Sequence, residues 1–167
     1  MAGRLRSLLV RKEMTITYKN GDATRPKERS LIIHVCNNAG TWGAGFVMAL
    51  SAIDETPERD YRAWAEKGVQ STGVPFELGN IQLSAFGDHI VVNMVAQDNL
   101  GMSAPPVRYD ALRECLEQVT QVAMKTGLPV VGPRFGAGIG GGQWVIIEDI
   151  INETLIAHDI PVTIYTL

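Results

Sequence analysis

Two glycine-rich stretches, each directly after a short apolar run, contain the residues whose types best suit chemistry. Residues 31–36 lead into the first, residues 37–45, and residues 128–132 lead into the second, residues 133–142. Glycine lets the backbone approach a ligand closely, and amide N–H groups at a strand-to-helix turn can face an anion. Phosphate is therefore the first ligand to consider. For a single such stretch, a tight strand-to-helix connection is the alternative.

Strands and helices alternate around these two stretches, which we call the first and second glycine loops. The predicted strands are 14–18, 31–36, 80–85, 89–95, 128–132 and 161–167, with a hairpin at 86–88. Helices are predicted to start near 46 and 56 and to cover 107–125 and 143–157, with Thr56 as the cap of the second and Pro57 in its first turn. Apolar central strands between helices favour a layered α/β fold with a mixed sheet.

The polar features of this pattern fall where strands end. Ligands of open α/β sheets bind beyond the carboxyl ends of the strands. Asp22 and both glycine loops follow such ends in the sequence. We therefore expect them to converge on one cleft. Asp22 taken alone suits an Asx turn or a helix N-cap equally well.

The composition is that of one globular domain. The chain has 167 residues, of which 46% are hydrophobic and 20% charged, and its longest uninterrupted apolar run, 46–50, is too short to cross a bilayer. We expect a single domain over residues 14–167 after a basic, disordered extension over residues 1–13. A transit or membrane-surface segment is the alternative for that extension.

Charge and cysteine usage exclude further classes of function. The net charge is −3, and residues 1–13 carry a surplus of three positive charges, so residues 14–167 carry −6. An acidic body argues against a nucleic-acid groove. Cys36 and Cys115 lack metal-ligand spacing and suggest buried side chains in a reducing, cytoplasmic compartment. We expect no metal, no cofactor, no membrane partner and a monomer.

At these residues the chain resembles the macro domain, an α/β module that binds ADP-ribose. The marks of the resemblance, which covers residues 14–167, are Gly21-Asp22-Ala23-Thr24, Trp42-Gly43-Ala44-Gly45, residues 133–139 with Gln143-Trp144, and residues 162–167. Each mark is weak alone, but the ordered set is specific. The resemblance implies a three-layer α/β/α fold. It is strongest to the branch that holds ADP-ribose 1″-phosphate phosphatase and terminal ADP-ribose protein glycohydrolase.

The resemblance also implies the roles of individual residues. Asp22 would accept a hydrogen bond from the adenine amino group, Ala23 would offer backbone beside it, and Leu167 would border the adenine. A plain edge-strand ending is the alternative for the terminal residues. The first glycine loop would line the distal ribose and the second would wrap the diphosphate. Their predicted ligand-binding residues are Asn37, Trp42, Gly43, Ala44, Gly45, Phe135, Gly136, Ala137, Gly138, Ile139 and Gly140.

Departures from the resembling branches bear on catalysis. The glycohydrolase branch uses a lysine where Gln97 stands and an aspartate at Gly140 or a neighbouring glycine, and another hydrolase class has an aspartate where residues 46–48 stand. The phosphatase branch has a histidine in an Ile-His-x-Cys-Asn context, which residues 33–37 match. We therefore expect His34 to act as general acid or nucleophile, with Asp98 as its partner. A core histidine and a solvated turn aspartate are the alternatives.

Three functions follow as hypotheses. The leading one is a phosphatase that acts on ADP-ribose 1″-phosphate. The others are a hydrolase of ADP-ribosyl esters and a non-catalytic reader of ADP-ribose, as a free nucleotide or on an ADP-ribosylated macromolecule.

Overall fold

The computed structural model describes residues 14–100, 106–138 and 140–167. Its strands are β1 (Thr17–Asn20), β2 (Leu31–Asn37), β3 (Ile81–Phe86), β4 (His89–Gln97), β5 (Val130–Gly132) and β6 (Val162–Thr166). Its helices are α2 (Phe46–Ile53), α3 (Thr56–Lys67), α4 (Tyr109–Thr126), α5 (Trp144–Thr154) and the short 3₁₀ helix η1 (Ile156–His158). The predicted extension over residues 1–13 and the predicted ligand-binding residue Ile139 lie outside the described residues.

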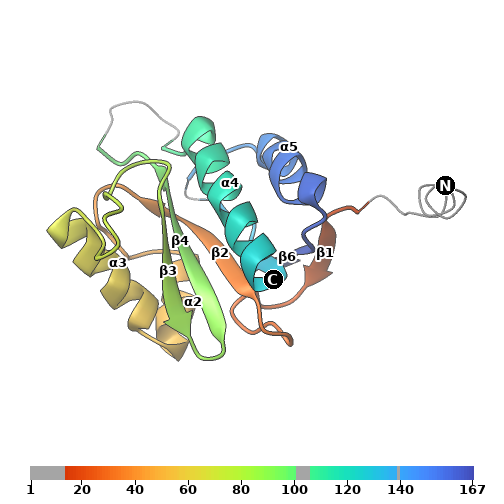
Figure 1. The fold of residues 1–167 in the computed structure, drawn as a ribbon, viewed down its shortest axis with the longest axis horizontal. Coiled ribbons are helices and arrows are strands. Elements are labelled where there is room, and N and C mark those ends of the chain that lie inside the picture. The colour runs from red at the N-terminus through yellow and green to blue at the C-terminus, as the bar shows by residue number, and fades with distance from the viewer. Residues whose placement is uncertain (1–13, 101–105, 139) are drawn as a thin grey trace, which may run out of the picture.

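The strands form one six-stranded mixed sheet in the order β1-β6-β5-β2-β4-β3 (Figure 1). All neighbouring pairs are parallel except the β3–β4 hairpin. The carboxyl ends of β1, β6, β5, β2 and β4 therefore lie at one edge of the sheet. Asp22 and both glycine loops follow strands that end at this edge. The two loops line one cleft, as expected, whereas Asp22 does not line it.

Helices cover both faces of the sheet, which confirms the predicted three-layer α/β/α fold. Alternation along β2 divides its side chains: Leu31 and Ile33 pack in a core with α4 and α5, whereas Ile32 and Cys36 pack in a second core with α2 and α3. Figure 1 shows α4 and α5 together on one side of the sheet. Both cysteines are free and buried, as predicted. No helix in the described part of the chain is long and apolar enough to cross a membrane.

The ends of several elements differ from the sequence-based prediction. Lys19 and Asn20, which lie beyond the predicted strand 14–18, belong to β1 because parallel pairing with β6 extends to Asn20 and Thr166. The predicted helix over 143–157 ends at Thr154 and continues as η1. Pairing and packing across the sheet set these ends, and local sequence cannot report them.

The residue that caps the start of α3 also differs from expectation. The amide N–H of Thr56 donates to Asp54 Oδ1 (2.9 Å), so Asp54 and not Thr56 caps the start of α3. Asp60 lies inside α3, where its carboxylate accepts a hydrogen bond from Ser84 Oγ (2.5 Å). Asp54 thus connects the end of α2 to the start of α3.

The capping assignment is testable. Replacing Asp54 with Ala should lower the free energy of unfolding by about 1 kcal/mol, because the first turn of α3 loses its side-chain acceptor. Thr56→Ala should cost less, since the backbone N–H that Asp54 accepts from is retained. Urea unfolding at pH 7 measures both, and a larger loss for Thr56→Ala would contradict the assignment.

Candidate functional site

A cleft of about 420 Å³ lies where the turns after β2 and β5 face each other. This volume is within the range of about 300–1,000 Å³ that ligand sites occupy. The predicted ligand-binding residues that line it are Asn37, Trp42, Gly43, Ala44, Gly45, Phe135, Gly136, Gly138 and Gly140. His34 reaches the cleft as well. Lining residues that sequence analysis did not propose as ligand-binding include Thr41, Gln97, Asn99 and Arg134.

The first glycine loop presents unpaired amide groups to the cleft. Within the described residues, the N–H groups of Gly43, Ala44 and Gly45 have no hydrogen-bond acceptor. Gly45 adopts a φ of 76° and directly precedes α2, so the loop ends at a helix N-terminus. Open amides next to a helix N-terminus suit an anion or a sugar hydroxyl.

The second glycine loop is closed by its own backbone bonds but leaves its middle open. Gly142 N–H donates to Gly136 O (2.8 Å) and Gly141 N–H donates to Gly138 O (3.0 Å). The N–H groups of Gly136, Ala137 and Gly138 have no acceptor in the part of the chain that the structure describes. Successive free amides in a turn form a concave anion-binding surface.

Glycine is required at some positions of this loop for packing and at another leaves room for a ligand. A Cβ added to Gly140 or Gly142 would lie 2.8 or 2.7 Å from Gly136 O, which is too close. A Cβ added to Gly138 would meet nothing within 4 Å. Gly138 therefore borders open space in the cleft. Its φ is not positive, so a side chain there would not strain the backbone.

The electrostatics of the cleft favour a negatively charged ligand. Among its described lining residues there is no carboxylate, and Arg134 is the cationic one. The guanidinium of Arg134 lies 5.6 Å from the ring centroids of both Tyr18 and Trp144, which hold it by cation–π contact. The Trp144 indole N–H in turn donates to the Tyr18 hydroxyl (3.0 Å).

The side chain of Asn37 shapes the first glycine loop from within. Its Oδ1 accepts hydrogen bonds from the N–H groups of Ala39 (2.9 Å) and Thr41 (3.2 Å) and from the Tyr61 hydroxyl (2.9 Å). Its Nδ2 donates to the carbonyl and hydroxyl oxygens of Thr41 (2.9 and 2.8 Å). With its polar atoms engaged in this way, Asn37 borders the cleft mainly as a loop-forming residue.

His34 does not suit the predicted role of general acid near neutral pH. Its Nε2 lies 2.6 Å from Asn93 Oδ1, its ring packs edge-on against Trp42, and only 2% of its surface is exposed. Burial lowers the pKa of His34 to about 4, although the hydrogen bond that the His34 ring donates to Asn93 Oδ1 opposes the shift. The imidazole is therefore neutral at pH 7 and lies at the floor of the cleft. This is close to the alternative of a core histidine, with a side-chain partner in place of a backbone one.

Asp98 does not pair with His34 in the structure. Its Oδ1 accepts hydrogen bonds from Asn38 Nδ2 (3.0 Å) and from the Leu100 N–H (3.1 Å), and its Oδ2 lies 3.7 Å from Arg108 Nη2. The contacts of the His34 ring do not include it. β2 points His34 toward α2 and α3, whereas Asp98 follows β4 and contacts Asn38 and Arg108, so the two side chains do not contact each other. Their joint role in catalysis stays a prediction.

Asp22 and Leu167 leave the sheet side by side without lining the cleft. The last pair of β1 and β6 is Asn20 with Thr166, and Gly21 N–H donates to Thr166 O (2.8 Å). Asp22 Oδ1 accepts hydrogen bonds from the side chain and backbone N–H of Thr24 (2.6 and 2.9 Å), which lower its pKa. Asp22 thus forms the Asx turn that was one of its two expected local roles.

The remaining predicted residues differ in exposure. Ala23 is buried, Leu167 is exposed, and Ala137 packs against the core beneath the second glycine loop. None of the three lines the cleft. The Asp22 carboxylate keeps its second oxygen toward Arg25 (3.8 Å), at the same edge as the cleft.

The fold and this edge define an α/β protein with an anion-accepting cleft at the carboxyl ends of its strands. A macrodomain protein from Streptomyces coelicolor is 38% identical, with 91% of this chain and 99% of that chain covered and a TM-score of 0.77. The chain therefore belongs to the macrodomain family. No protein-family model matches it.

Curated relatives are more distant or match a shorter segment. An ADP-ribose 1″-phosphate phosphatase from Chaetomium globosum is 25% identical over 146 residues, which cover 78% of this chain and 79% of the relative. The ADP-ribose glycohydrolase OARD1 from Bos taurus is 38% identical over 60 residues, 35% of this chain and 40% of the relative.

The buried state of His34 predicts a pH-dependent stability. Its pKa is about 4 in the folded protein against 6.5 ordinarily, so the unfolded chain takes up the proton first as the pH falls. The stabilisation is complete above the ordinary pKa and is lost as the pH falls toward the folded pKa, by about 3 kcal/mol in all. Urea unfolding between neutral and acidic pH measures this loss.

The matched control is His34→Gln, which keeps an N–H donor for Asn93 but does not titrate. Its stability should fall less over the same pH range than that of the wild type. Equal losses in both proteins would show that other groups cause the pH dependence.

Proposed function

We propose that the protein binds ADP-ribose in this cleft, with the diphosphate on the second glycine loop and the distal ribose on the first. The observation that carries the proposal is the pair of facing loops: among the described residues, their central amides have no acceptor and no carboxylate lines the cleft. A diphosphate supplies acceptor oxygens for such donors without the repulsion that an acidic lining would cause. The names of the curated relatives support this choice of ligand.

We propose that the adenine lies toward Asp22, outside the cleft proper. Asp22 retains a carboxylate oxygen that is not used by Thr24, and it lies at the carboxyl edge next to the end of β6. An ionised carboxylate is a good acceptor for the exocyclic amino group of adenine. In this arrangement Ala23 and Leu167 would border the base.

Hydrolysis of ADP-ribose 1″-phosphate is the second candidate. It is favoured by the similarity to the fungal phosphatase along most of both chains. The geometry supports it less than binding, because His34 is neutral and buried and Asp98 is engaged with Asn38 and Arg108. Binding without turnover is therefore the function we favour.

Hydrolysis of ADP-ribosyl esters is supported least. Gln97, which stands where the resembling glycohydrolases have a lysine, lines the cleft, and an amide cannot act as an amine nucleophile. Gly140 adjoins it: a Cβ there would lie 3.2 Å from Gln97 Oε1 and 2.8 Å from Gly136 O. The loop as folded has no room for an acidic side chain at Gly140.

Binding can be tested with a variant that fills the cleft. Gly138→Val should fold normally, because its Cβ meets nothing within 4 Å, yet it should lower ADP-ribose affinity by tenfold or more by occupying ligand space. Isothermal titration calorimetry measures the affinity and thermal melting the stability. Ala85→Val on the exposed side of β3 is the control. Wild-type affinity in a folded Gly138→Val would refute the role of the second glycine loop.

Turnover is decided by incubating the wild type with ADP-ribose 1″-phosphate and measuring inorganic phosphate. We expect binding of the nucleotide with phosphate release no greater than in buffer. Release that falls roughly a hundredfold or more in His34→Gln would instead establish the phosphatase and a catalytic role for His34. Release that His34→Gln leaves unchanged would establish the activity and remove His34 from it.

A further inference from the structure

We propose that Glu58 and Arg62 of α3 are positioning residues that hold the first glycine loop in its binding shape by clamping Trp42. Neither residue lines the cleft. The inference rests on the proposed function, because the shape it concerns is that of the ADP-ribose site. It goes beyond that function in one respect: the charged residues Glu58 and Arg62 of α3, outside the cleft, should control the affinity of the cleft for ADP-ribose.

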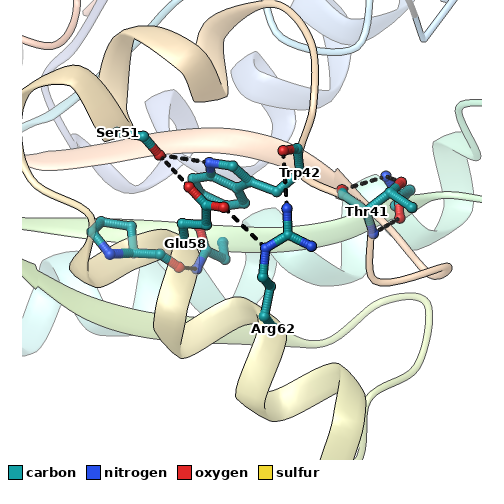
Figure 2. A network of polar contacts seen from close by, with 8 residues as sticks. Thr41, Trp42, Ser51, Glu58 and Arg62 are labelled. Carbon is teal, nitrogen blue, oxygen red and sulfur yellow. Dashed lines mark hydrogen bonds and ion pairs between the residues drawn. The ribbon is translucent and has the colours of Figure 1, made fainter.

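The clamp is a closed circuit of hydrogen bonds (Figure 2). The Trp42 indole N–H donates to Ser51 Oγ (2.8 Å), and the Ser51 hydroxyl donates to Glu58 Oε1 (2.9 Å). Arg62 Nε donates to Glu58 Oε2 (3.0 Å), and Arg62 Nη2 donates to the Trp42 carbonyl oxygen (3.3 Å). Both the side chain and the backbone of Trp42 are thereby tied to α3.

Trp42 is the natural anchor of the loop. It is 4% exposed and packs against His34 (ring centroids 5.4 Å apart) and Tyr61 (5.5 Å). Residues 43–45, directly after it, are exposed, and their amides have no acceptor in the described chain. The path of these amides therefore depends on what holds the two ends of the segment, which are Trp42 before it and α2 after it, where Met48 N–H donates to Gly45 O (3.1 Å).

An arginine is needed because the clamp uses two of its nitrogens in different directions. Nε contacts helix α3 through Glu58, while Nη2 contacts the loop backbone. The planar guanidinium offers both donors in a fixed fork, whereas a lysine ammonium would have to choose one geometry. Arg62→Lys keeps the charge and the proximity to Glu58 but should lose the bond to Trp42.

An ordinary surface ion pair is the competing explanation. Glu58 and Arg62 are spaced i, i+4, and their side chains are 27% and 49% exposed, so the pair should contribute little to stability. An ion pair of that kind would leave the cleft unaffected. The two explanations therefore predict different ADP-ribose affinities and different Trp42 indole N–H exchange rates for Arg62 variants, but similar melting temperatures.

The experiment compares Arg62→Met and Arg62→Lys with the control Arg113→Met. Arg113 pairs with Glu153 between α4 and α5 with similar exposure, on the opposite face of the sheet. Two quantities are measured: ADP-ribose affinity by calorimetry, and the exchange rate of the Trp42 indole N–H by ¹⁵N NMR, assigned with Trp42→Phe. Melting temperatures verify that all variants fold.

We expect both Arg62 variants to bind ADP-ribose roughly tenfold more weakly, the scale set by losing one hydrogen bond from a charged group. The Trp42 indole N–H should exchange roughly tenfold faster in both, and Arg113→Met should match the wild type in both measurements. Because Arg62→Lys retains the charge, weaker binding there cannot be attributed to lost long-range attraction.

Wild-type affinity in Arg62→Met, or rescue by Arg62→Lys, would overturn the positioning role. If the wild type itself does not bind ADP-ribose, the proposed function fails and the positioning role fails with it. The indole exchange rate would then still report whether Arg62 clamps Trp42. Faster exchange with unchanged affinity would confine the circuit to a structural role and would also overturn the proposal.

Discussion

Parallel pairing around β2 is the constraint on which the site depends. Because β2 lies between β5 and β4 and runs parallel to both, the turns after these strands must leave the sheet at the same edge. A backbone leaving a parallel strand has amide groups that the sheet no longer satisfies. In the two glycine loops several of these amides have no acceptor among the described residues, so the backbone offers hydrogen-bond donors to the cleft.

The charge of the cleft at this edge of the sheet differs from that of the rest of the protein. Residues 14–167 carry a net charge of −6, yet no described lining residue of the cleft is acidic. Asp98 lies between Gln97 and Asn99, which line the cleft. Its carboxylate accepts a hydrogen bond from Asn38 and lies near the Arg108 guanidinium, whose positive charge offsets the negative charge of Asp98. A site built from amide dipoles can therefore accept an anion within an acidic protein.

Behind the cleft, a buried polar network replaces what would otherwise be apolar core. Asn93 Nδ2 donates to Gln82 Oε1 (3.0 Å), Gln82 Nε2 donates to the Asp60 carbonyl oxygen (2.8 Å), and His34 Nε2 contacts Asn93. In the described residues no buried side-chain polar atom lacks a partner. Because every polar atom of this network is paired, the neutral His34 ring can remain at the floor of the cleft. The network also connects the cleft floor to α3, the helix whose Arg62 contacts Trp42 of the first glycine loop.

The sequence by itself determined the order of elements, the layered α/β class with a mixed sheet, and both glycine loops with their position after strands, because apolar runs and glycine positions are local signals. It also identified the family. Only the tertiary structure decided the partners of polar side chains. His34 lies within the predicted strand 31–36 and Asp98 follows the predicted strand 89–95. Alternation in β2 turns His34 into the core, whereas Asn38 and Arg108 contact Asp98. Likewise, the contact of Arg62 with Trp42 joins residues 20 positions apart, and nothing in the i, i+4 pattern of α3 reveals it. Such side-chain pairs form only between the faces of helices and strands that pack against each other, and the packing of the helices on the sheet determines which faces those are.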